Sequence, residues 1–318
     1  INNEENLVQN QSVVDTINDD GRDEEDPAPI QNQAVVAILD VLESHTDRNI
    51  LLDSSTPQGQ AFIKILEEVI SIDTINPFRV EQRYALMVTY YSTSGERWLL
   101  RDGWEIFDDD HCSWFGVTSC KQMEDGNAAI TGLDLSHNNL AGSIPSELCI
   151  LSSTVEQLHM GDNILLGGDI PQCVSQFRNL IELTMDDCRL SGPLPQGLLT
   201  IPTLEIVHLY DNQLTGTMDT LFLESNDNSM TSNVFRIQRS QNLKEFKAYS
   251  NQLSGTIPNA LSSFPWLESI WLYDNNLSGD VTSDVCDLRS VFLSELILDC
   301  VSCEGTSACD CCTMCYCN

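Results

Sequence analysis

Apolar residues recur through the middle of the chain in one repeating pattern, L-x-x-L-x-L-x-x-N-x-L, which first appears at Ile130. Six copies are well formed and a seventh is degenerate. They follow one another at a nearly constant interval, with one longer interval after the fourth copy, and their central apolar residues are Leu133, Leu158, Leu183, Val207, Phe246, Ile270 and Leu296. Each L-x-L segment predicts a short strand whose apolar side chains point inward. Because one such turn of chain cannot bury these side chains alone, the pattern predicts stacked coils that share a continuous core.

A polar residue follows each predicted strand at a fixed place. It is asparagine in five copies, at Asn138, Asn163, Asn212, Asn251 and Asn275. An amide at this position can serve the backbone groups of adjacent turns, so the sequence predicts an internal ladder of side-chain amides. Cys188 takes the place in the third copy, where we expect a small buried donor rather than a disulfide partner.

A second signature, L-x-G-x-I-P, follows the strand in most copies, as in Leu140–Pro145 and Leu253–Pro258. This signature resembles the plant-type leucine-rich repeat of plant receptor ectodomains and inhibitor proteins, and the resemblance covers residues 112–299. It implies an α/β repeat solenoid, a right-handed leucine-rich-repeat superhelix, with an extra short strand per coil beside the concave sheet. We expect a helical N-terminal capping domain and a disulfide-rich C-terminal cap to close its two ends.

The segment before the first repeat carries two further resemblances. Cys112-Ser-Trp114-Phe-Gly-Val-Thr-Ser-Cys120 is similar to the C-x-W-x-G-V-x-C cap of plant-type ectodomains, with one extra residue, and the similarity implies a Cys112–Cys120 disulfide. Residues 82–98 and the cysteine-rich tail at 309–317 are similar to a leucine-rich-repeat family of diatoms. Members of that family often place an acidic linker and a single N-terminal membrane anchor before the repeats.

Residues 31–98 predict three helices, the first two from apolar residues at i, i+3, i+4 and i+7 and the third from an apolar stripe. The stripes begin at Val35, Phe62 and Val80, and Thr56 with Pro57 supplies an N-cap and a first-turn proline for the second helix. We expect these helices to pack together and on the first coil as an enlarged cap. The alternative is a helical module that binds a partner.

Four regions follow from these patterns. Residues 1–30 predict an acidic flexible linker, because the stretch from Ile1 to Asp26 holds nine acids and one base. Residues 31–129 form the helical extension and N-cap, residues 130–299 hold about seven repeats with an insertion near 219–241, and residues 300–318 form a cysteine-rich cap.

The formal net charge is −33, with 48 acidic and 15 basic residues. Such a surface repels nucleic acid and anionic lipid, so neither is expected as a partner. No apolar stretch approaches the roughly 20 residues that span a bilayer. The chain opens without a signal peptide, and a membrane anchor upstream of Ile1 stays open as an alternative.

Thirteen cysteines indicate an oxidising compartment. Eight crowd into residues 286–317, too tightly for zinc knuckles, so disulfides are expected and no metal. These are Cys286, Cys300, Cys303, Cys309, Cys311, Cys312, Cys315 and Cys317. Eight cysteines allow 105 pairings, so the connectivity is left open. Cys149 and Cys173 follow the turns of adjacent repeats, where a disulfide can join neighbouring coils. Asn10 and Asn276 begin glycosylation sequons and agree with an extracellular or cell-surface location.

Solvent-facing positions of stacked strands form columns, and aromatic side chains gather in two of them over the fourth to sixth repeats. The candidate ligand-binding residues are His208, Tyr210, Lys247, Tyr249, Trp271 and Tyr273. Aromatic residues with a polar tip are typical of binding hot spots and also suit stacking on sugars. The alternative is that they only stabilise the sheet through cross-strand pairs. A neighbouring acidic column, such as Asp187 and Asp211, is compatible with calcium, but we favour solvated acids of a consensus turn.

Signatures of catalysis are absent: the chain has no phosphate loop, no G-x-S-x-G and no H-E-x-x-H, and no cofactor is expected. The sequence therefore predicts a recognition ectodomain, receptor-like or cell-surface, that binds a peptide, protein or glycan through its concave face. Two alternatives stay open, a structural or adhesive protein of the cell wall or matrix, and a protein inhibitor of a secreted hydrolase.

Overall fold

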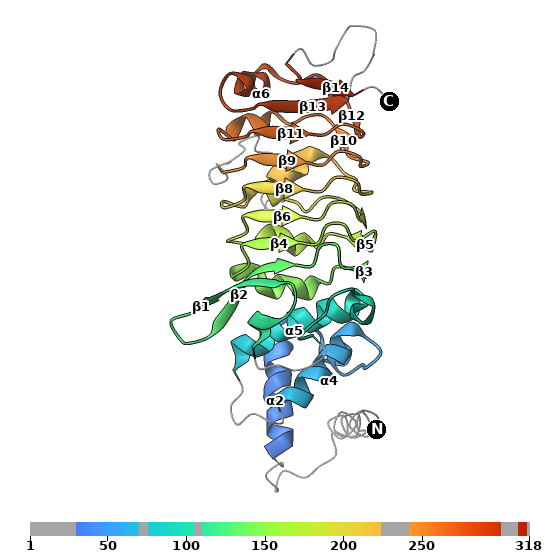
Figure 1. Cartoon of the computed structure of the whole chain (residues 1–318), viewed down its shortest axis with the longest axis vertical. Helices are drawn as coiled ribbons and strands as arrows, with labels where there is room; N and C mark the ends of the chain where they lie inside the picture. Colours follow the sequence, from blue (N-terminus) through green and yellow to red (C-terminus); the bar gives the residue numbers. More distant parts are fainter. Residues whose placement is uncertain (1–29, 70–75, 105–109, 224–241, 300–310, 317–318) are drawn as a thin grey trace.

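A computed structural model describes residues 30–69, 76–104, 110–223, 242–299 and 311–316. The molecule is an elongated stack, with helices at its N-terminal end and flat coils of chain above them (Figure 1). The leucine-rich-repeat solenoid predicted from the sequence is confirmed.

The main sheet has nine strands in the order β1-β2-β4-β6-β8-β9-β11-β13-β14. Its repeat strands are β2 (Ala128–Asp134), β4 (Gln157–His159), β6 (Glu182–Thr184), β8 (Ile206–His208), β9 (Glu245–Lys247), β11 (Ser269–Trp271) and β13 (Glu295–Asp299). We number the coils 1 to 7 by these strands. They pair in parallel, and the central apolar residues lie in register from Leu133 to Leu296. The longer interval between coils 4 and 5 does not interrupt the sheet, because Val207 still pairs with Phe246.

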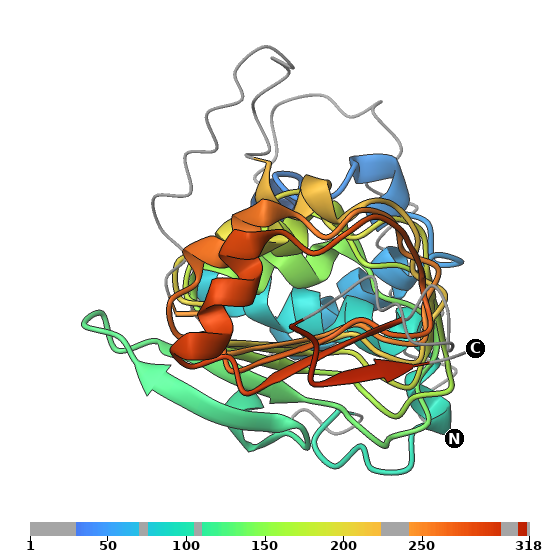
Figure 2. The same ribbon diagram turned by 90° about the horizontal axis from the view of Figure 1, so that it is seen from above.

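The opposite side of coils 1 to 6 carries short helices, so strands line one side of the stack and helices the other (Figure 2). These helices are η3 (Ser146–Ser153), η4 (Gln172–Gln176), η5 (Leu198–Thr200), η6 (Met218–Phe222), η7 (Asn259–Ser263), α6 (Ser283–Asp287) and η8 (Leu288–Ser290). Between the two sides the repeat leucines are completely buried, including Leu133, Leu183 and Leu296. Removing this apolar surface from water is the main force that holds the stack together.

Shorter strands after the turn form the second sheet that the plant-type signature implies. β3 (Ala141–Ser143), β5 (Leu165–Asp169) and β7 (Arg189–Ser191) pair in one piece, and β10 (Ser254–Gly255) and β12 (Asn276–Leu277) in another. In the described part of the chain, isolated bridges, Pro193 with Thr215 and Thr217 with Ser254, join the two pieces through coil 4. Pro193 has no backbone N–H to donate, which limits pairing at this point.

The predicted amide ladder is present, and Asn163 shows its chemistry. This side chain is fully buried. It donates to the carbonyl oxygens of Leu135, Met160 and Gly161 at 2.9–3.1 Å and accepts from the N–H groups of Asn138 and Leu140 at 3.0 Å. Asn212, Asn251 and Asn275 repeat this pattern in coils 4 to 6. Each amide therefore satisfies backbone groups of its own coil and of the coil before it.

Cys188 fills the ladder position in coil 3 as a thiol, as predicted. Its Sγ lies 3.2 Å from the Asp186 carbonyl oxygen and 3.5 Å from that of Met160. Burial raises the pKa of the thiol to about 12, so it stays protonated and can donate. A thiol accepts hydrogen bonds poorly, so coil 3 lacks the strong acceptor that an amide oxygen provides.

Helices cover the first coil, as the apolar stripes predict. α2 (Ile30–Leu42), α4 (Pro57–Val69) and α5 (Pro77–Ser92) are the three expected helices, and α3 (Arg48–Leu51) is an additional short one. Thr56 caps α4 by accepting from the N–H of Gly59 at 2.9 Å. α5 is the central helix, because it packs against α2, α4, η3 and β2 and buries ten of its sixteen residues.

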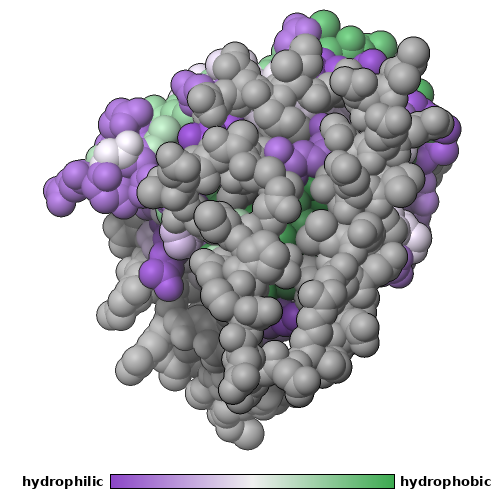
Figure 3. All heavy atoms as spheres, turned by 90° about the horizontal axis from the view of Figure 1, so that it is seen from below, coloured by the Kyte–Doolittle hydropathy of each residue, from purple (hydrophilic) through white to green (hydrophobic). Residues whose placement is uncertain are grey.

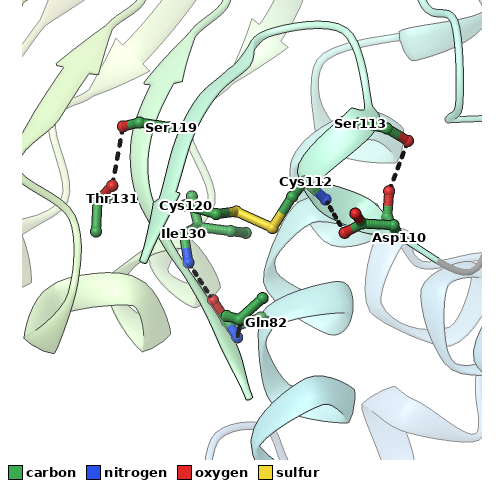
Figure 4. The surroundings of a disulfide bond; sticks show 9 residues. Gln82, Asp110, Cys112, Ser113, Ser119, Cys120, Ile130 and Thr131 are labelled. Atoms are coloured by element: carbon green, nitrogen blue, oxygen red, sulfur yellow. Dashed lines mark hydrogen bonds between the residues drawn. A yellow bond between two sulfur atoms is a disulfide. The ribbon is translucent and has the colours of Figure 1, made fainter. Parts of the chain in front are cut away.

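Hydrogen bonds join α5 to the sheet, and a disulfide lies beside them (Figure 4). The Gln82 amide donates to the Ala128 carbonyl oxygen at 3.0 Å and accepts from the Ile130 N–H at 2.7 Å. The predicted Cys112–Cys120 disulfide joins η2 (His111–Ser113) to β1 (Val117–Gln122). β1 pairs antiparallel with β2, and this hairpin projects from the stack (Figure 2).

Two more disulfides strengthen the stack. Cys149 and Cys173 join coils 1 and 2, as predicted, and Cys286 pairs with Cys311 of the tail. Cys312 is also disulfide-bonded. β14 (Met314–Tyr316), which the sequence did not predict, adds a parallel strand to β13 and contains Cys315.

Some predictions fall outside the described residues. These are the acidic linker and Asn10, the central part of the insertion at 224–241, and Cys300, Cys303, Cys309 and Cys317. Among the residues that are described, no helix is both long enough and apolar enough to cross a membrane. At the helical end, the described residues that are visible include both hydrophilic and hydrophobic ones (Figure 3).

The ladder leads to a first prediction. Asn163→Ala removes five hydrogen bonds and leaves buried backbone groups unsatisfied, so we expect it to lower the free energy of unfolding by about 3 kcal/mol or more. Cys188→Asn is expected to raise it by about 1 kcal/mol, because it supplies the missing acceptor. Urea unfolding measures both. Asn242→Ala, at an exposed asparagine, is the control, and an Asn163→Ala loss no larger than the control's would contradict the ladder's role.

A second prediction concerns His111, which is 4% exposed. Burial and the positive charges of Arg83 and Arg79 lower its pKa from 6.5 to about 4. The unfolded chain therefore binds the proton first as the pH falls. His111 contributes about 3 kcal/mol of stability above pH 6.5, and this is lost as the pH falls toward 4.

The measurement is urea unfolding at several pH values. We expect His111→Asn to flatten the loss of stability between pH 6.5 and 4 relative to the original protein, whereas His45→Gln, at a partly exposed ion pair, leaves it in place. An equally steep loss in His111→Asn would show that other groups cause it.

Candidate functional site

Three tyrosines stand on consecutive coils at the edge where the main-sheet strands end. Tyr210, Tyr249 and Tyr273 each follow the inner apolar residue of their repeat. Their carbonyl oxygens accept from the N–H groups of Asp187, Asp211 and Ser250 on the preceding coils at 3.0–3.1 Å. These backbone bonds fix the three side chains in one column.

The three tyrosine rings stack face to face. The centroids of Tyr210 and Tyr249 are 4.6 Å apart with planes inclined by 4°, and those of Tyr249 and Tyr273 are 4.5 Å apart at 8°. These separations match the roughly 4.8 Å between neighbouring strands. Both faces of Tyr249 are therefore covered by its neighbours, and the stack presents ring edges rather than ring faces.

A second column runs beside the tyrosines and holds His208, Lys247 and Trp271. The Lys247 ammonium lies 4.7 Å from the centre of the Trp271 ring, and that ring lies 5.9 Å from Tyr249. His208 lies 6.0 Å from Tyr210, ring to ring. The structure thus brings together all six residues that the sequence singled out.

Carboxylates hold the second column in place, and the sequence pattern alone did not point to them. Glu245 Oε2 lies 2.6 Å from Lys247 Nζ and 2.9 Å from His208 Nε2. Glu295 Oε2 accepts from Trp271 Nε1 at 3.0 Å. Both glutamates stand two residues before a position of this column, and residues i and i+2 of a strand share a face. That spacing is the signal that could have revealed them.

Similar pairs lie between other positions of neighbouring coils. His159 Nε2 lies 3.1 Å from Glu182 Oε2, and Lys244 Nζ lies 2.6 Å from Glu205 Oε2. The described histidines and lysines of this face are therefore paired with carboxylates of the same face. An incoming ligand must compete with these internal pairs.

Burial shifts the pKa values of this surface. Burial raises the pKa of Glu245, but hydrogen bonds from Lys247 and His208 outweigh it, and the pKa lies below its usual value. Burial, followed by the nearby Asp186, raises the pKa of Tyr210, and burial also raises that of Tyr249. The phenols are therefore neutral hydrogen-bonding groups at physiological pH.

The acidic column beside the tyrosines occupies a left-handed turn. Its members all have positive φ between 49° and 57°: His137, Asp162, Asp187, Asp211, Ser250 and Asp274. Aspartate tolerates this conformation better than most residues, so the turn itself accounts for the acids. Burial and the charges of Asp211, Asp162 and Asp186 raise the pKa of Asp187, which indicates a concentration of negative charge here.

The described residues also include one group of potential metal ligands and one exposed sequon asparagine. Within the described ranges, His111, Cys112 and Cys120 form the one group of three potential metal ligands whose ligand atoms lie within 4.8 Å of one another, and both cysteines are in a disulfide. Asn276 lies exposed in β12, as a glycosylation site requires.

Comparisons with known proteins agree with the repeat type. A Leucine Rich Repeat family model matches residues 129–151. Receptor-like protein 31 of Arabidopsis thaliana is 35% identical over 117 residues, which are 37% of this chain and 12% of that protein. Receptor-like protein 7 of the same plant is 28% identical over 171 residues, 52% of this chain and 16% of that protein. The chain spans less than a fifth of the length of these two relatives.

Solved structures give weaker likenesses. The ectodomain of the Arabidopsis thaliana receptor kinase SOBIR1 has a TM-score of 0.49 at 22% identity, covering 63% of this chain and 97% of that one. The plant peptide hormone receptor RGFR1 in complex with RGF2 has a TM-score of 0.43 at 28% identity, covering 54% and 25%. The fold, the family model and the receptor-like relatives together identify the repeats as plant-type leucine-rich repeats.

Proposed function

We propose that this chain is an extracellular recognition ectodomain that binds a peptide or protein segment on its main sheet, over coils 4 to 6. The observation that carries the proposal is the group of Tyr210, Tyr249, Tyr273 and Trp271, which lie partly exposed on one face. Aromatic side chains with polar tips are the residue types most enriched in binding hot spots. The similarity to receptor-like proteins of Arabidopsis thaliana supports a recognition role.

The packing of the rings favours a peptide over a glycan. A sugar binds an aromatic residue by lying flat on the ring face, but both faces of Tyr249 are covered by Tyr210 and Tyr273. Lys247 stands over the Trp271 ring. What the stack offers is ring edges and phenol groups, which can exchange hydrogen bonds with a peptide backbone and with polar side chains.

The charge of the face favours a basic ligand. Lys247 and His208 are both paired with Glu245, and acids follow in the turn column beside the tyrosines. With a net charge of −33 on the chain, a cationic segment is also drawn in by the long-range field. A peptide that carries basic side chains is therefore the ligand class that this surface fits best.

An extracellular setting agrees with the covalent structure. Three disulfides are described, at the N-terminal cap, between coils 1 and 2, and at the C-terminal cap. Such bonds persist in oxidising compartments. The narrower similarity to the diatom family, with its membrane anchor, stays a proposal that rests on residues 82–98 and on the cysteine-rich tail.

The test is selection from a random peptide display library, run in parallel with a glycan array. We expect the protein to enrich peptides with basic residues. Tyr249→Ala combined with Trp271→Ala is expected to weaken their binding by at least tenfold, because it removes two central contacts.

Trp266→Ala is the matched control, since Trp266 is an exposed aromatic residue between η7 and β11, outside the tyrosine and tryptophan columns. The control is expected to bind like the original protein. Peptide binding that survives the double substitution would exclude this face, and Tyr249-dependent binding to glycans alone would overturn the peptide assignment.

A further inference from the structure

We propose that Trp271, Glu245, Glu295 and Ser269 form a subsite for a guanidinium group of the ligand, and that Lys247 occupies this subsite in the free protein. The inference rests on the proposed function, because it assigns one side chain of the ligand to one place on the sheet. It identifies that ligand side chain as an arginine and identifies Lys247 as the group of the protein that the arginine displaces.

Lys247 shows that the place accepts a cation. Its ammonium group lies over Trp271 at 4.7 Å from the ring centre and bonds Glu245 at 2.6 Å. A cation over an indole ring with a carboxylate beside it is a favourable arrangement in a partly desolvated site. The side chain of Lys247 is 18% exposed, so the cation is largely withdrawn from water.

Ser269 supplies an independent observation. Its residue is only 6% exposed, and in the described part of the chain its hydroxyl group has no hydrogen-bond partner. Buried hydroxyl groups are nearly always bonded, because an unsatisfied one costs roughly 1–3 kcal/mol. In the sheet register Ser269 stands between Glu245 and Glu295, and it shares a face with Trp271, two residues on. The hydroxyl therefore belongs to the same subsite and lacks a partner there.

A guanidinium group fits this set better than the ammonium of Lys247. It is planar, so it can lie on the indole ring, and it has five N–H donors in a fixed fork. Lys247 bonds Glu245, whereas an arginine on Trp271 can donate to a carboxylate and to the Ser269 hydroxyl together. Displaced into water, the Lys247 ammonium regains its hydration. The exchange of one cation for another leaves the charge of the subsite unchanged.

The experiment uses the whole chain and butylguanidinium as the probe, at concentrations well below those that denature. Binding is followed by the indole N–H signals in nuclear magnetic resonance spectra. The signal of Trp271 is assigned among the five tryptophans by its absence from Trp271→Phe. In Lys247→Met the occupant is gone, and we expect the probe to bind about ten times more tightly than to the original protein.

Lys244→Met is the matched control. Lys244 directly precedes β9, the strand that contains Lys247, and its ammonium group pairs with Glu205 at 2.6 Å. Its removal lowers the positive charge equally, and it is expected to leave the Trp271 response unchanged. If Lys244→Met strengthens probe binding as much as Lys247→Met, general charge explains the effect and the subsite is overturned.

Ser269→Ala, introduced into Lys247→Met, tests the hydroxyl group. We expect probe binding to weaken by a few-fold while the unfolding midpoint stays the same or rises, because an unpartnered buried hydroxyl is removed. Unchanged probe binding would remove Ser269 from the subsite. No movement of the Trp271 signal in Lys247→Met would overturn the whole proposal. That failure is distinct from failure of the proposed function, since peptides can still depend on Tyr249 when a free guanidinium does not bind.

Discussion

The structure depends on one constraint: no coil can bury its own apolar side chains or complete its own backbone hydrogen bonds. The repeat leucines of a coil are buried only when a neighbour covers them, and its backbone turns are satisfied by an amide that the next coil supplies. At the two ends of the stack, other residues must therefore supply the hydrogen bonds that a neighbouring coil would make. Asn138 exchanges hydrogen bonds with Leu100 of the N-terminal cap, and Asp299 accepts from the N–H groups of Asp274 and Asn275 where the amides end. The caps thus continue the chemistry of the ladder as well as covering the core.

The same constraint creates the binding surface. Because the ladder and the core fix each coil against the next, equivalent residues repeat at the strand spacing of roughly 4.8 Å. A residue type used in successive repeats becomes a continuous column, and three tyrosines become a stack with separations of 4.5–4.6 Å. The insertion between coils 4 and 5 lengthens one connection without moving Phe246 out of register with Val207. Tyr210 and Tyr249 therefore meet although the whole insertion lies between them in the sequence.

The features that could be predicted from the sequence are those repeated by the pattern. Periodic residues or resemblance predict the strand register, the amide ladder with Cys188 in it and the three main helices. They also predict the disulfides Cys112–Cys120 and Cys149–Cys173. Features that arise where the chain departs from the repeat pattern were not predicted. β14 arises in a tail without repeats, and the second sheet is reduced to isolated bridges through coil 4. The six candidate residues were found by column, but the columns do not give ring orientation or partners. The face-to-face stacking and the role of Glu245 emerge only in three dimensions.

Internal pairing on the sheet determines how such a face can discriminate between ligands. On this surface the lysine and histidine side chains already bond carboxylates of the protein. A charged ligand group must therefore replace an existing ion pair, and a ligand charge alone adds little affinity. Affinity then comes from groups that make more bonds than the ones they displace. Among the described residues, Ser269 is a buried member of this face whose hydroxyl group lacks a hydrogen bond, so replacing Lys247 over Trp271 is an exchange in which bonds can be gained. Ligands without a suitable cation leave Lys247 over Trp271 and do not gain the additional bonds. The exchange therefore favours specificity more than tight binding.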